Sequence, residues 1–319
     1  MIRAWLASGG VAKEVEAKDA VRAAVENRGN VWIDLDGADE PICRDLLAPF
    51  EIHPLVLEDV FAEVNRPKVD DYGRYLYVVV HSARWDEERP KLRELDIILG
   101  EHFLITYHDG STRSVDSANQ VLPRRPSLLE NGPAPLFHFM LDELVDHYLP
   151  IIDKVADDID DLEAQIFDPG ATDVNAKVVR LKRGMSALRR IVGPQRDTVL
   201  ALTRDEFHVI PAELRPYLRD VYDRLARVSD LLDSFRDETA SLLELHVSIV
   251  SNRLNEVIKR LTVLATVGLP LTIVASWYGM NFKFPEYEWP WPWDLAFAVG
   301  LFALTAGLTW WYLKKRRWD

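Results

Sequence analysis

Two long apolar segments near the end of the chain place the strongest constraint on its fold. Residues 261–278 and 295–313 contain no acidic or basic side chain and are mostly apolar. Each is close to the ~20 residues that an α-helix needs to cross the hydrocarbon core of a bilayer. One such segment alone is compatible with a buried helix of a soluble protein. Two segments, the second followed by a basic run, predict two transmembrane helices.

Charged and aromatic residues at the ends of these segments predict the orientation of the chain. Lys259 and Arg260 precede the first segment, and residues 310–312 (Trp-Trp-Tyr) with the basic run 314–317 end the second. Because basic residues stay on the cytoplasmic side, both termini should be cytoplasmic and the loop 279–294 should face outward. The N-terminus has no long apolar run, so no cleavable signal peptide is expected. The sequence thus predicts a multi-pass protein of the cytoplasmic (inner) membrane.

Composition narrows the class of function. The chain has 38 Lys and Arg against 51 Asp and Glu, a formal net charge of −13. This acidity argues against a nucleic-acid partner and suits metal cations, although most of the carboxylates also serve to hydrate the surface. The single cysteine, Cys43, fits a reducing compartment. No phosphate-binding loop, nucleophile elbow or HExxH motif occurs, so an enzyme is not expected.

Residue patterns predict an α/β domain, then helices. Strands are expected at 31–35 and 74–80, and two more within 96–107, joined by a turn at Gly100-Glu101. Pro41 and Pro54 are each expected to begin a helix. We expect the following domains: an α/β domain 1–130, a helical hairpin 131–212, a long helix 213–278 that includes the first span, an outer loop 279–294, and a second span with a basic tail 295–319.

Apolar residues at helical spacing predict three long helices after residue 131. The first includes 141–166 and ends at Asp168-Pro169-Gly170, and the second covers 173–191, where Gly193-Pro194 interrupts or kinks it. The acidic run 153–163 lies on other faces of the first helix, where it is either a solvated surface or an attractor of cations. The third helix runs from Pro216 to Leu269 and on to Tyr278, with apolar residues at four-three spacing from 221 to 249.

The end of the first span carries the most specific motif, Tyr278-Gly279-Met280-Asn281-Phe282. With two C-terminal spans and a basic terminus, this motif resembles the CorA magnesium transporters. Residues 251–257 and 270–272 resemble the pore helix of that family, while 53–59 and 65–68 resemble its cytoplasmic domain. The resemblance therefore covers nearly the whole chain.

This resemblance implies a CorA-like fold, a funnel-shaped homopentamer that transports divalent cations, with Mg²⁺ as both the transported and the regulatory ion and Co²⁺ or Ni²⁺ as further substrates. Gly279, Met280 and Asn281 would form the selectivity filter. Further pore-lining candidates are Asn255, Leu261, Thr262, Leu269 and Thr272. Of these, Leu261 and Leu269 are candidates for a dewetting constriction, and membrane lipid would surround the second span.

The chemistry of the motif can be stated from its residues. Mg²⁺ sheds its water reluctantly, so a neutral amide oxygen such as that of Asn281 suits capture of the hydrated ion and its release. Gly279 lacks a Cβ and permits a tight turn at the helix end. The alternative role of Asn281 is a helix C-cap. The hydroxyls of Thr262, Thr266 and Thr272 either line a pore or bond to the carbonyl one turn back.

Regulation is implied by the same resemblance. Asp86 and Asp220 match the carboxylate pair that holds Mg²⁺ between subunits of the family, and Glu244 is a further candidate ligand. An ion that binds the closed state better would close the channel when internal Mg²⁺ is high. The alternative for all three is a solvated surface carboxylate.

Two other functions remain open at this stage. One is a transporter of the same fold that prefers zinc, including a proton-coupled one, although zinc-transporting relatives usually depart from Gly-Met-Asn at the position of Met280. The other is a membrane-tethered coiled-coil sensor without transport, which gives no reason for the polar tripeptide.

Overall fold

The computed structural model describes residues 1–61, 65–86, 89–168, 170, 173–204, 207–280 and 292–315. The chain divides into two compact units, Met1–Leu243 and Glu244–Asp319. The strands are β1 Ile2–Ser8, β2 Val11–Glu14, β3 Asn30–Asp36, β4 Lys68–Asp71, β5 Tyr75–Asp86, β6 Arg89–Gly100 and β7 Phe103–His108. The α-helices are α1 Ala17–Val25, α2 Glu40–Leu47, α3 Pro54–Val60, α4 Arg113–Val121, α5 Ser127–Glu130, α6 Ala134–Asp146, α7 Leu149–Phe167, α8 Val174–Arg204, α9 Arg215–Tyr278 and α10 Trp293–Lys315.

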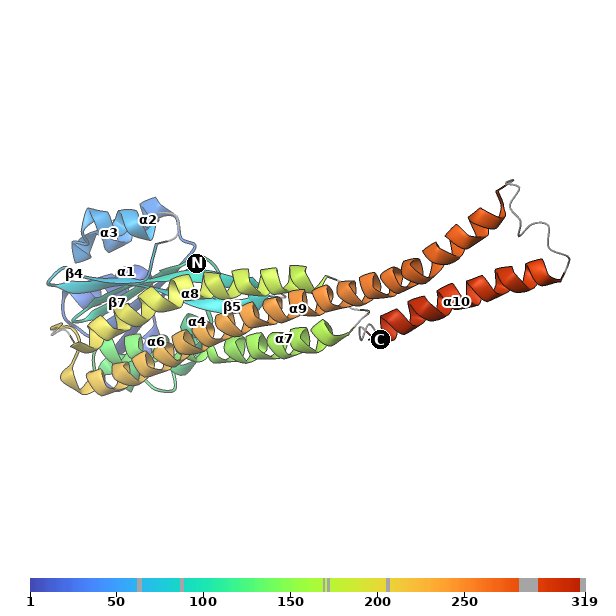
Figure 1. Cartoon of the computed structure of the whole chain (residues 1–319). Helices are drawn as coiled ribbons and strands as arrows, with labels where there is room; N and C mark the ends of the chain where they lie inside the picture. Colours follow the sequence, from blue (N-terminus) through green and yellow to red (C-terminus); the bar gives the residue numbers. More distant parts are fainter. Residues whose placement is uncertain are drawn as a thin grey trace. The chain divides into compact units, whose positions relative to one another are not determined.

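A seven-stranded sheet forms the centre of the first unit, in the order β2-β1-β3-β7-β6-β5-β4 (Figure 1). Strands β3 and β7 pair in parallel, and the other neighbouring strands pair antiparallel. Successive side chains of β5 point to opposite faces of the sheet. Tyr75, Tyr77 and Val79 belong to the core between the sheet and helices α1, α2 and α3. Leu76 and Val78 are equally buried on the other face, where α6 and α8 contact the sheet. Burial on both faces explains the unbroken apolar run of this strand.

The β6–β7 hairpin differs from the prediction by one residue. Leu99 pairs with Leu104, so the loop consists of Glu101 and His102, and Gly100 is the last residue of β6. A Cβ on Gly100 would lie 2.3 Å from the ring of Phe103. The glycine is therefore required by the close approach of an aromatic ring and not by the turn itself.

Two prolines affect the helices differently from the predictions. The periodic run 141–166 forms two helices, α6 and α7, because Pro150 lies in the first turn of α7. Pro194, in contrast, does not interrupt α8, which continues to Arg204. The next residue, Gln195, accepts a hydrogen bond from the backbone N–H of His81 in β5 at 2.8 Å. This tertiary contact holds the helix on the sheet through the proline.

Helices α6, α7 and α8 belong to the same compact unit as the sheet. Helix α7 packs against α8, as expected for a hairpin, and α8 contacts β4, β5 and β6. The boundaries expected near residues 130 and 212 therefore do not separate compact units, which divide between Leu243 and Glu244. Helices α6 and α8 bury apolar residues against the sheet and α7 packs against α8, so the three helices share the core of the sheet unit.

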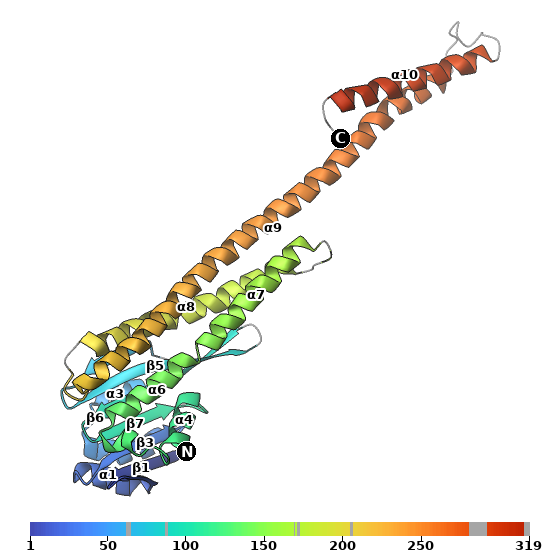
Figure 2. The same ribbon diagram turned by 90° about the horizontal axis from the view of Figure 1, so that it is seen from below.

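Helix α9 is a single element of 64 residues that continues through Pro270, as predicted (Figure 2). Its four-three apolar stripe is buried from Val221 to Leu232 and again at Thr239 and Leu242. From Leu243 to Ile273, all of which the structure describes, no residue is buried. The packed part of α9 thus ends at the boundary between the two units.

The second unit contains the two predicted spans. The end of α9 and helix α10 are each long and apolar enough to cross a membrane. Neither has the buried surface of a core helix in a soluble protein, because almost all of the apolar window of each is exposed. Helix α10 ends with Lys314 and Lys315, and the Lys315 ammonium lies 5.0 Å from the centre of the Trp311 ring. This is the aromatic and basic arrangement expected at a membrane surface.

Candidate ion pathway and regulatory carboxylates

The end of α9 is closed by a tightened last turn. The N–H of Gly279 donates to the carbonyls of Ala275 and Ser276, at 3.1 and 3.2 Å, and that of Met280 donates to Trp277 at 3.2 Å. Gly279 does not adopt a left-handed conformation, and a Cβ there would make only ordinary contacts of 3.5 Å. The turn at Gly279 is closed by hydrogen bonds of the three-residue type, and its backbone conformation does not require glycine. Asn281, the predicted filter residue, lies outside the described residues.

Three of the predicted lining residues share one face of α9. Asn255, Thr262 and Leu269 are separated by seven residues each, which rotates the side chain by only about 20° per step. Leu261 lies about 100° from Thr262, and Thr272 about 60° from Leu269, on the same helical geometry. The five candidates therefore do not form one stripe. Leu261 and Leu269 are both largely exposed, at 60% and 62%.

The threonine hydroxyls of the first span bond to their own helix. Thr262 donates to the carbonyl of Ile258 at 2.8 Å, Thr266 to Thr262 at 2.6 Å, and Thr272 to Gly268 at 2.8 Å. Each hydroxyl proton is thereby engaged by a carbonyl one turn back along the helix. The free lone pairs of the hydroxyl oxygens can still accept hydrogen bonds, which the water shell of a hydrated cation donates.

Asp86, at the end of β5, already has a cationic partner. Lys91 of the neighbouring strand β6 forms an ion pair with it, and the same hydrogen bond lowers the pKa of the Asp86 carboxyl below its ordinary value. Within the chain, Asp86 is therefore held as a carboxylate by a lysine and not by a metal ion.

Asp220, the second predicted ligand, belongs to a cluster around Arg224. The guanidinium of Arg224 pairs with Asp142 and Asp146 of α6, and with Asp220 one turn away on α9 at 2.9 Å. Glu244 is exposed on α9, about 36 Å along the helix from Asp220. Among the described residues, no group of three or more His, Cys, Asp or Glu is arranged to hold a metal. One chain thus does not bring the predicted regulatory residues together.

Sequence reasoning missed Arg224 as the partner of Asp220. The four-residue spacing of Asp220 and Arg224 on a helix was a visible signal for this pair. The two carboxylates from α6 could not be found in this way, because they come from a separate element. In the acidic run of α7, Asp153 and Asp157 are exposed, and Asp158 pairs with Lys154 at 2.8 Å. This run forms a solvated helix face in the single chain.

A buried polar cluster lies at the carboxyl ends of the parallel strands β3 and β7. His108 places Nε2 3.2 Å from Asp34 Oδ1 and Nδ1 2.7 Å from the carbonyl of Gly110. Burial lowers the pKa of His108, but the hydrogen bond and charge of Asp34 outweigh this effect and raise it above its ordinary value. Both ring nitrogens face acceptors, so the doubly protonated ring fits the site best.

An α/β unit followed by two exposed apolar helices defines a membrane protein with a large soluble portion. Comparisons with known proteins identify its family. The sequence model described as "CorA-like Mg2+ transporter protein" matches residues 27–315. The chain belongs to this family, which makes it a divalent metal transporter of the CorA type and not an enzyme, as the sequence predicts.

Individual relatives agree with this assignment. The chain is 32% identical over 293 residues to the cobalt/magnesium transport protein CorA of Thermotoga maritima, covering 90% of this chain and 83% of the relative. It is 24% identical over 322 residues to the zinc transport protein ZntB of an Enterobacter species, covering 99% and 95%. The solved CorA magnesium transporter of Methanocaldococcus jannaschii has the same fold, with a TM-score of 0.84 at 17% identity over 100% of this chain and 99% of that one. The predicted fold class is therefore confirmed.

Proposed function

We propose that several copies of this chain, five as the family resemblance implies, assemble around an axis and conduct Mg²⁺ into the cytoplasm. The observation that carries this proposal is the uncovered apolar surface of α9. Val247, Leu254 and Ile258 are more than half exposed. They precede Lys259 and Arg260, which mark the cytoplasmic side of the membrane. Lipid cannot cover residues on the water side, so their cover must come from other copies of α9.

The seven-residue spacing of Asn255, Thr262 and Leu269 supports α9 as the lining helix. In a left-handed bundle, residues seven apart keep facing the same neighbour or axis. With this stripe turned toward the axis, Asn255 and Thr262 present oxygen atoms and Leu269 forms an apolar ring that gates by dewetting. Leu261 and Thr272 lie at the sides of the stripe, where they contact adjacent helices and narrow the pore indirectly.

At the outer end of this path, Gly279, Met280 and Asn281 form the proposed filter. Mg²⁺ holds its water shell firmly, so a ring of neutral amide oxygens orients the hydrated ion without stripping it. A ring of carboxylates would bind more strongly and slow the release that conduction requires. The basic ends of both spans support cytoplasmic termini in the inner membrane and an outward-facing filter.

The test is Mg²⁺ uptake into proteoliposomes under an inward-negative potential. Asn281→Ala should reduce uptake strongly, and Asn255→Ala should reduce it as well. Asn252→Ala is a matched control, because it removes the same side chain from the same helix about 60° away from the stripe. Equal uptake by wild type and Asn281→Ala would refute the filter.

Regulation by internal Mg²⁺ is the finer part of the proposal. A Mg²⁺ ion between Asp86 of one copy and Asp220 of the next would displace Lys91 and Arg224 from these carboxylates. Glu244 lies about 36 Å from Asp220 along α9, so as a further ligand it would hold a separate regulatory ion. Displacement of two internal cations weakens the site, which suits a sensor that responds at millimolar Mg²⁺. Asp220→Ala should leave uptake active at internal Mg²⁺ concentrations that close the wild type, and unchanged inhibition would remove this role.

The similarity to ZntB supports a second candidate, a zinc-transporting protein of the same fold. Met280 and the higher identity to a cobalt/magnesium transporter favour the first candidate. Uptake of Mg²⁺, Co²⁺ and Zn²⁺ measured side by side, with and without a proton gradient, distinguishes them. Hexaamminecobalt(III), which mimics hydrated Mg²⁺ without exchanging its ligands, should block the magnesium channel and not a zinc transporter that strips its ion.

A further inference from the structure

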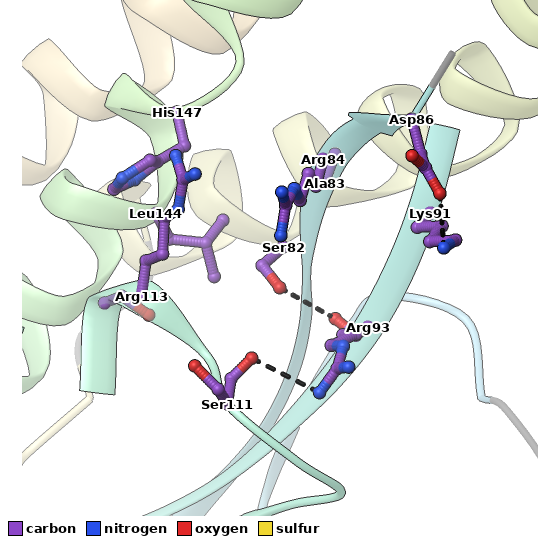
Figure 3. A pocket seen from close by; sticks show the side chains of 11 residues that line it. Ser82, Ala83, Arg84, Asp86, Lys91, Arg93, Ser111, Arg113, Leu144 and His147 are labelled. Atoms are coloured by element: carbon purple, nitrogen blue, oxygen red, sulfur yellow. Dashed lines mark hydrogen bonds and ion pairs between the residues drawn. The ribbon is translucent and has the colours of Figure 1, made fainter. Parts of the chain in front are cut away.

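A cavity of about 290 Å³ in the first unit has four basic side chains in its lining. Figure 3 shows it between strands β5 and β6, the segment that enters α4, and the end of α6. The basic residues are Arg84, Lys91, Arg93 and Arg113, and among the residues that the structure describes Asp86 is the single acidic residue in the lining. The chain as a whole carries a net charge of −13, so this local excess of positive charge runs against its composition. Such a concave basic site attracts anions.

The positions of two arginines are fixed by backbone contacts. Arg93 donates to the carbonyl oxygens of Asp109 and Ser111, at 3.0 and 3.3 Å, which orient the guanidinium without neutralising it. Gly110 lies between these carbonyls with a φ of +78°, and a Cβ there would be 2.3 Å from the Arg93 guanidinium. Only glycine therefore allows the loop to wrap around Arg93. Arg113 is held at the cavity as the first residue of α4.

One residue of the cavity lining carries a buried, unsatisfied hydroxyl. Ser114, the second residue of α4, is only 1% exposed, and its Oγ has no hydrogen-bond partner. A buried hydroxyl without a partner is costly, so a ligand that supplies an acceptor would relieve it. Thr112, the N-cap residue, makes no side-chain capping bond to the first turn of α4. The N-terminus of a nine-residue helix therefore adds its partial positive charge to the cavity.

We propose that this cavity binds a phosphate group, either as inorganic phosphate or carried on a small molecule such as a nucleotide. The Arg113 guanidinium and the backbone amides of Arg113 and Ser114 would donate to the phosphate oxygens, joined by Ser114 Oγ–H once its side chain turns toward the ligand. Arg84 would supply further charge, whereas Lys91 is paired with Asp86. The hydroxyl of Ser111 is not part of this donor set, because it already donates to Asp116 at 2.7 Å. The cavity is larger than one phosphate and leaves room for part of a carrier molecule. This site does not depend on the ion pathway proposed above.

Binding can be measured by equilibrium dialysis of radiolabelled phosphate and ATP against the full-length protein. The protein is kept in dodecyl maltoside, without lipid and with EDTA, so that no lipid phosphate or metal complex contributes. We expect saturable binding that sulfate displaces and chloride at equal ionic strength does not. Tighter binding of ATP identifies a carried phosphate as the natural ligand, and equal binding identifies phosphate itself. Either result supports the site.

The decisive variant is Ser114→Ala, which removes the unsatisfied hydroxyl and should not weaken folding. It should weaken phosphate binding by about tenfold, as expected for one hydrogen bond to a charged group. Arg113→Gln should weaken it by a similar factor, and Arg183→Gln, an exposed arginine of α8 outside the cavity, should not. Absence of saturable binding at 10 mM phosphate or ATP, or equal affinity in wild type and Ser114→Ala, would overturn the proposal.

Discussion

Removal of Arg224 should destabilise the first unit and create a dependence on Mg²⁺. In Arg224→Ala, three carboxylates from α6 and α9 lose the cation that they share. The pair with Asp142 is the best shielded, and a hydrogen bond to a charged group of this kind contributes about 1.5–3 kcal/mol. The pairs with the more exposed Asp146 and Asp220 add about 0.2–1 kcal/mol each. The total loss is about 2–5 kcal/mol.

A loss of this size is measurable as a shift in melting temperature. For a unit of this length, it corresponds to a decrease of about 4–20 °C. The three unpaired carboxylates should then bind Mg²⁺, and an ion present at ten times its dissociation constant restores about 1.4 kcal/mol. The assay is thermal unfolding of the full-length protein in detergent, followed by tryptophan fluorescence in EDTA and in 10 mM MgCl₂.

The matched control for this experiment is Arg236→Ala, which removes an arginine of the same helix that pairs with its exposed neighbour Asp237. This variant should melt within about 1 °C of the wild type and gain no more from Mg²⁺ than the wild type does. The reasoning would fail if Arg224→Ala melted like the wild type, or if both variants lost the same stability. Loss of stability without any rescue by Mg²⁺ would refute the part of the argument that concerns the metal.

Two further predictions concern the sheet. Gly100→Ala should destabilise the protein by about 1–3 kcal/mol, because its Cβ would clash with the Phe103 ring. Gly193→Ala, in open space within α8, should instead stabilise it by up to about 1 kcal/mol. Urea unfolding of both variants tests this contrast. The raised pKa of His108 stabilises the fold fully below pH 6.5, the ordinary value, and this contribution is lost as the pH rises through the folded-state pKa. Melting temperatures from pH 5 to 9 should therefore depend less on pH in His108→Gln than in wild type, and parallel curves would contradict the assignment.

The elements that were predicted correctly are those with a long pattern of apolar residues in the sequence itself. The spans, the extent of α9 and the strand 74–80 follow from apolar patterns that no tertiary contact overrides. Pro194 shows where local signals fail: the residue favours a break, but the contact of Gln195 with β5 holds the helix together. Gly100 was assigned to a turn because no local pattern shows that an aromatic ring lies against it.

The candidate site was predicted less completely, for a different physical reason. The motif around Gly279 and the seven-residue spacing of Asn255, Thr262 and Leu269 are visible in the chain itself. The ion pairs of Asp86 and Asp220 depend on neighbours in space, since Lys91 comes from the adjacent strand and Asp142 from α6. A single sequence shows carboxylates but not whether a lysine or an arginine already neutralises them.

The uncovered apolar surface of α9 has a genetic consequence. In the proposed assembly, each copy of α9 depends on its neighbours to cover its apolar surface. A variant that still assembles but does not conduct should therefore inactivate the wild-type copies in the same ring. Such an allele would be dominant over the normal gene. A substitution that disrupts the surface itself, such as a charged residue in place of Leu254, would keep the encoded protein out of the ring. An allele of this kind would be recessive.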